Sequence, residues 1–415
     1  MTERRIHAPR ISRYLPTQGT EFVSVEVLSG IALLLAAASA LIWANVDASS
    51  YADLWGTHLT IGIGDLAISE SLLKWVNDGL MVLFFFVVGL EIKRELVEGE
   101  LRDPRAAALP VLGAFGGMLV PALIFVAFNA GGAGSRGWGI PMATDIAFAL
   151  GVLALLGPRI PSGLKLFLLT LAIVDDVGAI LVIAVFYTSD MEPMWLIGAA
   201  AAIVGVLVLR RVGVMNPWVY VLPGVVLWVC THESGIHATI AGVALGLLTP
   251  VTRGPEAGPL ETLERRLHPW TSFLIVPIFA LANAGVVLAG DSLERAAGSA
   301  ITWGVIAGLV VGKVIGVSVF ALGARRLGIG RLPDGVRGMQ VIGAGILAGI
   351  GFTVSIFVAN LSFGSGLLDE AKIGVLGASL IAGILGAIWL RAVGRPSVPP
   401  IPEALVPAPE SDGSR

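Results

Sequence analysis

Two adjacent carboxylates, Asp175 and Asp176, lie in the middle of an apolar segment, residues 162–188, that is long enough to cross a lipid bilayer. A charged side chain near the bilayer centre costs about 3 kcal/mol or more, so it normally faces a water-filled path or a partner. Two neighbouring carboxylates also repel each other. Such a pair is expected where a cation or a proton is always available to neutralise it, and the sequence therefore indicates a protein that moves cations.

The composition supports a membrane protein. Of the 415 residues 55% are hydrophobic and 14% are charged, and the mean hydropathy is +0.86, whereas about a quarter of the residues of a soluble domain are charged. The 53 glycines suit close helix packing in a membrane. The single cysteine excludes an intrachain disulfide, and no basic patch with interleaved aromatic residues points to a nucleic acid partner.

Apolar segments of near-spanning length predict an all-α polytopic membrane protein with about twelve transmembrane helices. The predicted spans are residues 24–46, 72–96, 106–128, 140–157, 162–188, 194–210, 217–231, 234–249, 267–289, 301–323, 340–360 and 370–392. The first apolar segment follows four arginines, as in a secretory signal, but it is too long for a signal's apolar region and is interpreted as an uncleaved membrane helix.

The loop charges predict the topology. Of the 27 Lys and Arg residues, 22 fall in the N-terminal segment or in the loops after every second helix, 4 fall in the alternate loops, and Lys313 lies inside a helix. This asymmetry follows the positive-inside rule and predicts that both termini are cytoplasmic. We therefore expect a cytoplasmic N-terminal segment over residues 1–21, one transmembrane domain over 22–393, and a disordered cytoplasmic tail over 394–415, which is rich in Pro, Ser and acidic residues. In the non-cytoplasmic loop 47–71, β-branched residues flank glycines and predict a small β-hairpin.

Few other ionisable residues lie within the predicted helices, and each has two interpretations. Asp78 is either a helix-end charge or a functional group. Lys313 needs a counter-ion if it is buried, and an aspartate of segment 162–188 is the candidate, either as a structural ion pair or as part of transport. His237, near Glu233, is either a helix-end residue or a proton sensor, because an imidazole titrates near pH 6.5.

Two predicted helices contain breaks. Span 140–157 begins with a proline, a threonine and an aspartate (Pro141, Thr144 and Asp145), and span 340–360 has four glycines followed by hydroxyl residues. Tight helix packing is the alternative explanation for the glycines. Discontinuous helices at matching places in two halves are typical of the midplane site of a transporter, and Asp145 is placed to balance the positive end of a half-helix.

A set of motifs, in the same order along residues 22–392, closely resembles the bacterial NhaA family of sodium/proton antiporters. They are Asn77-Asp-Gly-Leu-Met81, Val88-Gly-Leu-Glu-Ile-Lys-Arg-Glu95, Ala143-Thr-Asp-Ile-Ala-Phe-Ala-Leu150, Ala172-Ile-Val-Asp-Asp-Val-Gly178, Ser234-Gly-Ile-His-Ala-Thr-Ile-Ala-Gly242, Leu267-His-Pro-Trp270, Phe279-Ala-Leu-Ala-Asn-Ala-Gly285 and Gly349-Ile-Gly-Phe-Thr353. This family is itself one of the systems from which inverted-topology repeats are known. Thr231-His-Glu233 departs from the pattern and adds titratable groups, so it bears on the pH range of any sensor.

The resemblance implies inverted-topology repeats with helices 4 and 11 crossing as unwound chains. It implies that Asp175 and Asp176 carry the ion and the protons, with Asp175, Asp176 and Thr144 as ligands of the transported Na+, Asp145 on the crossing chain, and Lys313 as the ion-pair partner of Asp175. It also implies that the hairpin in loop 47–71 is a homodimer contact. The pH-response residues that it implies are Glu91, Arg94, Glu95, His237 and Glu264, and Asp78 is a further candidate.

The expected function is secondary antiport in which Na+ or Li+ leaves the cell in exchange for inward protons, regulated by pH and serving sodium and pH homeostasis. Na+ binding needs deprotonated oxygen ligands, so ion binding and proton release are linked. We expect no enzyme activity and no cofactor, and a location in the bacterial inner membrane in contact with lipid.

Two other classes of protein are alternatives. Gly62-Ile-Gly-Asp65 matches the GxGD pattern of intramembrane aspartyl proteases, but it lies in a predicted loop outside any span. A passive cation channel is the second alternative, although channel filters more often come from symmetric subunits or rings of carbonyls.

Overall fold

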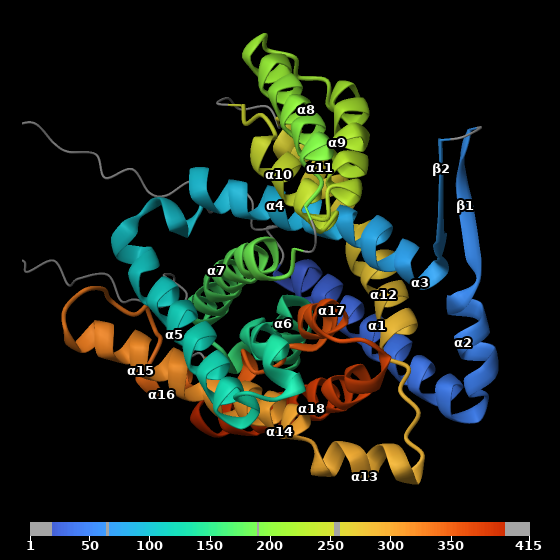
Figure 1. The fold of residues 1–415 in the computed structure, drawn as a ribbon. Coiled ribbons are helices and arrows are strands. Elements are labelled where there is room, and N and C mark those ends of the chain that lie inside the picture. The colour runs from blue at the N-terminus through green and yellow to red at the C-terminus, as the bar shows by residue number, and fades with distance from the viewer. Residues whose placement is uncertain (1–18, 64–65, 189–190, 253–257, 395–415) are drawn as a thin grey trace, which may run out of the picture.

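The computed structural model describes residues 19–63, 66–188, 191–252 and 258–394, and these residues form an almost entirely helical bundle (Figure 1). The predicted N-terminal segment falls largely outside the described residues, and the predicted tail does so almost entirely. The all-α polytopic membrane fold predicted from the apolar segments is confirmed.

Six stretches of helix are long and apolar enough to cross a membrane unbroken. Many of their large apolar side chains are exposed, as on Leu35 and Ile42 of the first and Leu380 and Ile388 of the last, which suits contact with lipid rather than water. The six are α1 (Gly19–Val46), α5 (Pro104–Asn129), α7 (Ser162–Phe186), α8 (Pro193–Arg211), α14 (Ala300–Ile306) joined through the π-helical turn η8 (Ala307–Gly312) to α15 (Lys313–Arg326), and α18 (Ser365–Val393).

The remaining predicted spans are built from shorter pieces. Span 72–96 is α3 (Leu72–Lys74), the π-helical turn η2 (Trp75–Leu80) and α4 (Met81–Val97). Span 217–231 becomes η6 (Pro217–Tyr220) and α9 (Val221–Glu233), and span 234–249 becomes α10 (Thr239–Leu248). Helix α10 begins later than predicted because Ser234-Gly-Ile-His237 forms an irregular connection with Gly235 at φ 82°. Short connecting helices complete the chain: η3 (Glu100–Arg102), η5 (Gly157–Arg159) and α13 (Gly290–Gly298).

The predicted bounds of span 267–289 were wrong at both ends. The helix begins eight residues earlier, as α11 (Pro259–Trp270), continues through η7 (Thr271–Ile275) and ends with α12 (Val276–Asn283). The residues of α11 are largely polar and amphipathic, so hydrophobicity alone does not predict that they are helical. The helix ends early because the backbone N–H of Gly285 bonds to the Tyr51 hydroxyl, 3.2 Å away, instead of continuing the helix.

Two helices are broken, as the sequence predicts. The helical segment η4 (Ala133–Met142) is followed after three residues by α6 (Ile146–Leu155), with a bend of 45°. Helix α16 (Gly338–Leu347) is followed after four residues by α17 (Phe352–Ser362), with a bend of 46°. The second pair matches predicted span 340–360 to within two residues at each end, whereas the first begins seven residues before predicted span 140–157.

Loop 47–71 contains the predicted hairpin and a helix that was not predicted. Helix α2 (Ala48–Gly56) leads into strands β1 (His58–Ile63) and β2 (Leu66–Ser71), which pair antiparallel with His58 opposite Ser71 and stand apart from the bundle at one edge (Figure 1). Asp65 of the GxGD tetrapeptide lies outside the described residues. The side of the bundle that carries this hairpin is called the hairpin side below.

The helices pack in two groups. One group, the crossing bundle, contains both broken helices together with α5, α7, α14, α15 and α18; the other, the hairpin bundle, contains α1–α4 and α8–α12. The groups meet along α1 and α6, α4 and α7, and α12 and α17. Glycine allows the closest approaches: a Cβ added to Gly116 of α5 would lie 2.4 Å from the carbonyl oxygen of Gly316 in α15, so both helices need glycine there.

Candidate ion-binding site at the crossing of the broken helices

The two breaks lie against each other and are joined through their backbones. The N–H of Asp145 donates to the carbonyl of Ile350 at 2.6 Å, and the Thr144 hydroxyl lies 2.9 Å from the carbonyl of Ala348. Ser355 Oγ donates to the carbonyl of Ile140 at 2.7 Å. The unwound residues thus satisfy each other's polar groups, which permits irregular backbone at membrane depth.

Asp145 caps two helices at once. Its Oδ1 accepts a hydrogen bond from the N–H of Phe148, 3.0 Å away, as the N-cap of α6. Its Oδ2 accepts from the N–H of Thr353 at 3.1 Å and from the Thr353 hydroxyl, at the start of α17. One carboxylate therefore stands between two helix N-termini, where its negative charge is opposed by two partial positive charges.

A matched pair of substitutions tests this capping. Asp145→Ala should remove both caps and lower the stability of the protein by about 0.5–2 kcal/mol for each cap. Asp145→Asn should lose much less, because asparagine also caps helices well. Thermal unfolding in detergent measures the difference, and equal destabilisation by Ala and Asn would contradict the capping assignment.

Asp175 and Lys313 form a buried ion pair that includes Thr144. Lys313 Nζ donates to Asp175 Oδ2 at 2.6 Å, to the carbonyl of Met142 at 2.5 Å and to Thr144 Oγ1 at 3.1 Å. The Thr144 hydroxyl lies 2.7 Å from the same Asp175 oxygen. Lys313 and Asp175 are fully buried, so the three donors of the ammonium are all matched within the crossing bundle.

Asp176 differs from its neighbour. It is buried, and among the described residues its carboxylate has neither an ion-pair nor a hydrogen-bond partner, while Asp175 Oδ1 is also without one. Unmatched buried oxygens are costly, so these atoms fit a ligand that brings positive charge, either a proton or a cation.

The donor set around the pair suits a small hard cation. Asp175 and Asp176 offer carboxylate oxygens, and Thr144 offers a hydroxyl beside them. Over the described ranges, no group of three or more His, Cys, Asp or Glu side chains is arranged to hold a metal ion. Two carboxylates and one hydroxyl provide at most about five oxygen atoms, whereas Ca²⁺ takes about six to eight oxygen ligands.

A second ionic cluster lies at the end of α4 that is remote from the hairpin. Arg94 forms an ion pair with Glu264 of α11, and its other nitrogen lies 3.7 Å from Glu95. Glu95 Oε2 also accepts from the N–H of Glu100 at 3.0 Å, and Glu91 interacts electrostatically with Arg94 and Glu264. Four of the predicted pH-response residues (Glu91, Arg94, Glu95 and Glu264) are therefore brought together.

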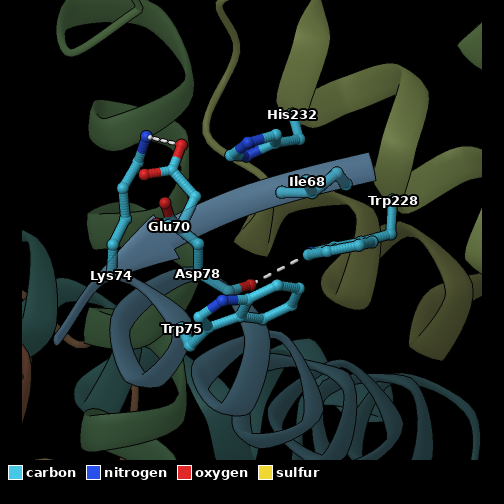
Figure 2. Close-up of a pocket in the computed structure, with 7 residues that line it drawn as sticks. All are labelled: Ile68, Glu70, Lys74, Trp75, Asp78, Trp228 and His232. Carbon is cyan, nitrogen blue, oxygen red and sulfur yellow. Dashed lines mark hydrogen bonds and ion pairs between the residues drawn. The ribbon is translucent and has the colours of Figure 1, made fainter. Parts of the chain in front are cut away.

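Asp78 and His237 are not part of that cluster. Asp78 is thirteen residues before Glu91 in the same span, which is about 20 Å along a helix. It lines a hollow on the hairpin side, and Figure 2 shows it between Trp75, Trp228 and the Glu70–Lys74 ion pair. The His237 ring lies edge-on to Phe357, with the ring centroids 6.1 Å apart. Asp78 and His237 therefore lie apart from the four clustered residues, and their part in a pH response stays a prediction.

Sequence reasoning missed two sets of polar residues. Thr353, which holds Asp145, lies in a quoted motif but was not assigned to the site. Three asparagines, Asn77, Asn283 and Asn360, are joined by side-chain hydrogen bonds. Their signal in the sequence is an amide inside each of three apolar spans, which does not show that they meet.

Crossed broken helices around a buried, partly unmatched pair of carboxylates define an ion-coupled secondary transporter. The family model for Na+/H+ antiporter 1 matches residues 20–390. The chain is 49% identical over 383 residues to the Na(+)/H(+) antiporter NhaA of Escherichia coli O1:K1 / APEC, with 91% of this chain and 98% of the relative covered, and the same values hold for the NhaA proteins of Shigella boydii serotype 4 (strain Sb227) and Shigella sonnei (strain Ss046). The chain belongs to the NhaA family of Na+/H+ antiporters.

Proposed function

We propose that this antiporter exports Na+ or Li+ in exchange for inward protons, that its activity is regulated by pH, and that it serves sodium and pH homeostasis. The observation that carries the proposal is the buried pair Asp175 and Asp176 with unmatched oxygens at the crossing of the broken helices. Membership of the Na+/H+ antiporter family supplies the class of exchange.

The exchange follows from competition for the same carboxylates. A cation needs the deprotonated oxygens of Asp175, Asp176 and the Thr144 hydroxyl, whereas protons neutralise the carboxylates directly. A pair left charged and empty at this depth is costly, so the site crosses the membrane with either ion or protons on it. This requirement couples the two flows.

Lys313 and Asp145 support the pair in different ways. Lys313 holds Asp175 by a 2.6 Å ion pair and is the partner that a bound cation must displace or share. Asp145 fixes the two half-helices to each other and adds negative charge near the site. Movement of the crossing bundle against the hairpin bundle then exposes the site to alternate sides.

The cluster of Arg94, Glu95, Glu91 and Glu264 is the proposed pH-response region. Glu264 lies on polar helix α11, ahead of the apolar part of its span, and burial raises the pKa of its carboxyl to about 7 against the opposing effect of Arg94. Glu264 is thus neutral below about pH 7 and charged above it, which strengthens its ion pair with Arg94. The folded chain holds this proton more tightly than the unfolded chain, so the associated stability is lost as the pH rises from about 4.5 to about 7. Asp78 and His237 are candidates for a separate response on the hairpin side.

Glu264→Gln tests the pH response. The amide keeps the shape and cannot gain charge, so exchange should stay near its low-pH rate across pH 6–8, where the parent's exchange rises. Rates of Na+-driven proton movement in proteoliposomes at several pH values measure this. Glu98→Gln, an exposed position after the end of α4, is the matched control and should keep the parent profile. A Glu264→Gln curve that superimposes on the parent's after scaling would remove Glu264 from the response.

We propose further that the protein lies in the bacterial inner membrane with both termini in the cytoplasm, which makes the hairpin side the outer side. The proposed homodimer contact is the hairpin, whose Leu59 and Ile61 side chains are exposed. A side-chain contact holds the hairpin in place for this use: the Trp75 indole Nε1 of η2 donates to the backbone carbonyl of Leu59 in β1 at 2.8 Å.

The test of the proposed function is Na+-driven or Li+-driven dissipation of a pH gradient in proteoliposomes, measured across pH. A carrier couples the imposed cation gradient to proton movement in the opposite direction. A channel would pass the cation without that coupling. Absence of any cation-dependent proton movement from pH 6 to pH 9 would overturn the proposal.

A further inference from the structure

Three asparagine side chains form a hydrogen-bonded chain across the hairpin side of the bundle. Asn283 Nδ2 donates to Asn77 Oδ1 at 2.8 Å, and Asn360 Nδ2 donates to Asn283 Oδ1 at 2.9 Å. Asn283 is fully buried. Asn283 and Asn360 each also donate to the backbone of their own helix, at 3.0 Å, so the chain has defined geometry at its centre.

The three residues come from three elements, and only one of the two links joins the two bundles. Asn77 lies in η2 and Asn283 ends α12, both in the hairpin bundle, whereas Asn360 lies in α17 of the crossing bundle. The Tyr51 hydroxyl of α2 donates to the carbonyls of Leu281 and Ala282, which places this end of α12 on the hairpin side. The link between Asn283 and Asn360 therefore joins the two bodies that alternate access moves apart.

A layer of aromatic rings lies between the amides and the candidate ion site. Phe357 of α17 lies against Phe85 and Phe279, with ring centroids 5.3 Å and 6.3 Å apart, and all three are buried. Along α17, Phe357 is about 6 Å beyond Thr353, which holds Asp145, and Asn360 is about 4.5 Å further. The order from the site outward is thus carboxylates, aromatic rings, amides.

On the far side of the amides is the hollow shown in Figure 2. Asp78, next to Asn77, faces it, and the Trp228 indole donates to the Asp78 carbonyl at 3.0 Å, which fixes the π-helical turn that presents both residues. In the described part of the chain the Asp78 carboxylate makes no hydrogen bond or salt bridge. The carboxylate shares the hollow with Lys74, which is paired with Glu70, and with His232, so polar and ionisable groups line the outer side of the amides.

We propose that Asn77, Asn283 and Asn360, with the aromatic layer of Phe85, Phe279 and Phe357, are the outer gate of the transport path, and that the Asn283–Asn360 link breaks and reforms in each transport cycle. This inference rests on the proposed alternating exchange. Neutral amides suit the task because their hydrogen bonds are readily exchanged for bonds to water, whereas a buried ion pair is much harder to separate. They also leave no fixed charge to trap a passing cation.

Reversible crosslinking tests the gate. In a Cys230→Ser background, which removes the only cysteine, the pair Asn283→Cys and Asn360→Cys is joined with a short bis-methanethiosulfonate reagent. Exchange in proteoliposomes should fall at least tenfold on crosslinking and return on reduction. The matched control is Asn77→Cys with Asn283→Cys, which joins two elements of the hairpin bundle and should leave exchange within about twofold of its uncrosslinked rate.

The same samples separate the gate from the proposed function. Exchange by the reduced pair shows that the transporter works, and full exchange by the crosslinked pair would then overturn the gate alone. No exchange by the parent chain at any pH would instead overturn the proposed function.

If the reduced asparagine pair does not exchange, two further readouts apply. Phe279→Cys with Phe357→Cys places the same bond between the same two helices, one layer deeper. Crosslinking yield at pH 9 needs no transport: it should change by twofold or more between Na+-containing and Na+-free buffer for the Asn283–Asn360 pair, and stay constant for the Asn77–Asn283 pair. Equal yields under both conditions would contradict separation of the helices.

Discussion

Replacing Asp176 by asparagine is expected to abolish Na+/H+ exchange while leaving the protein folded and inserted in the membrane. The amide keeps the size of the side chain but removes the negative charge that a cation needs and the group that carries a proton. In the structure this carboxylate makes no bond among the described residues, so no internal contact is lost with it. The loss of activity should therefore exceed a hundredfold without a matching loss of stability.

Three measurements on Asp176→Asn distinguish a site residue from a structural one. Exchange is measured in proteoliposomes, Na+ binding by calorimetry in detergent, and folding by thermal unfolding. Asp334→Asn, at an exposed aspartate in the loop before α16, is the control and should match the parent in all three. Na+ binding by Asp176→Asn at the parent's affinity would contradict the proposed role.

The centre of the site was predictable because its chemistry is conspicuous in an apolar chain. Asp175, Asp176 and Lys313 are charges where charges are costly, and the proline and glycine residues around Thr144 and Gly349 mark the breaks. The structure brings these features together through contacts such as the 2.6 Å Lys313–Asp175 ion pair. Residues that violate the apolar pattern are the ones that sequence reasoning finds.

The asparagine chain was not predictable for the opposite reason. Asn77, Asn283 and Asn360 are separated by 206 and 77 residues, and a neutral amide in an apolar helix costs too little to stand out. Their meeting depends on how two bundles pack, which local sequence does not encode. The same limit applies to Asp78 and His237: they are titratable like the residues of the cluster around Arg94, but the sequence does not show that they lie apart from it.

The predicted helix bounds were wrong where a helix contains polar residues. Helix α11 begins at Pro259 with a polar amphipathic face, so an apolar window starts too late. Helix α2 was assigned to a loop because its nine residues are mixed in character and too few to span. In both cases hydrophobicity identifies the apolar residues that contact lipid, but it does not identify helical residues outside the apolar segments.

Lys313→Ala is expected to have the largest effect on stability, because it breaks a fully buried ion pair. The substitution leaves Asp175 without the ammonium at 2.6 Å and the carbonyl of Met142 without its donor at 2.5 Å. Breaking such a pair from one side typically costs about 3–5 kcal/mol. The unfolding temperature in detergent should fall accordingly, and the loss should be greater at alkaline pH, where Asp175 is less able to escape by binding a proton.

The double variant Lys313→Ala with Asp175→Asn separates a structural role of Lys313 from a role in carrying protons. Removing both charges leaves no unpaired member of the ion pair, so most of the lost stability should return if the broken pair is the cause.

Exchange by Lys313→Ala alone shows whether Lys313 carries a transported proton. If Lys313 only neutralises Asp175, exchange persists with a shifted pH profile and an unchanged ratio of current to Na+ flux. If Lys313 itself releases a transported proton, that ratio changes. The measurement is charge movement and Na+ flux on the same membranes, with Lys372→Ala, a buried lysine of α18 outside the site, as the control.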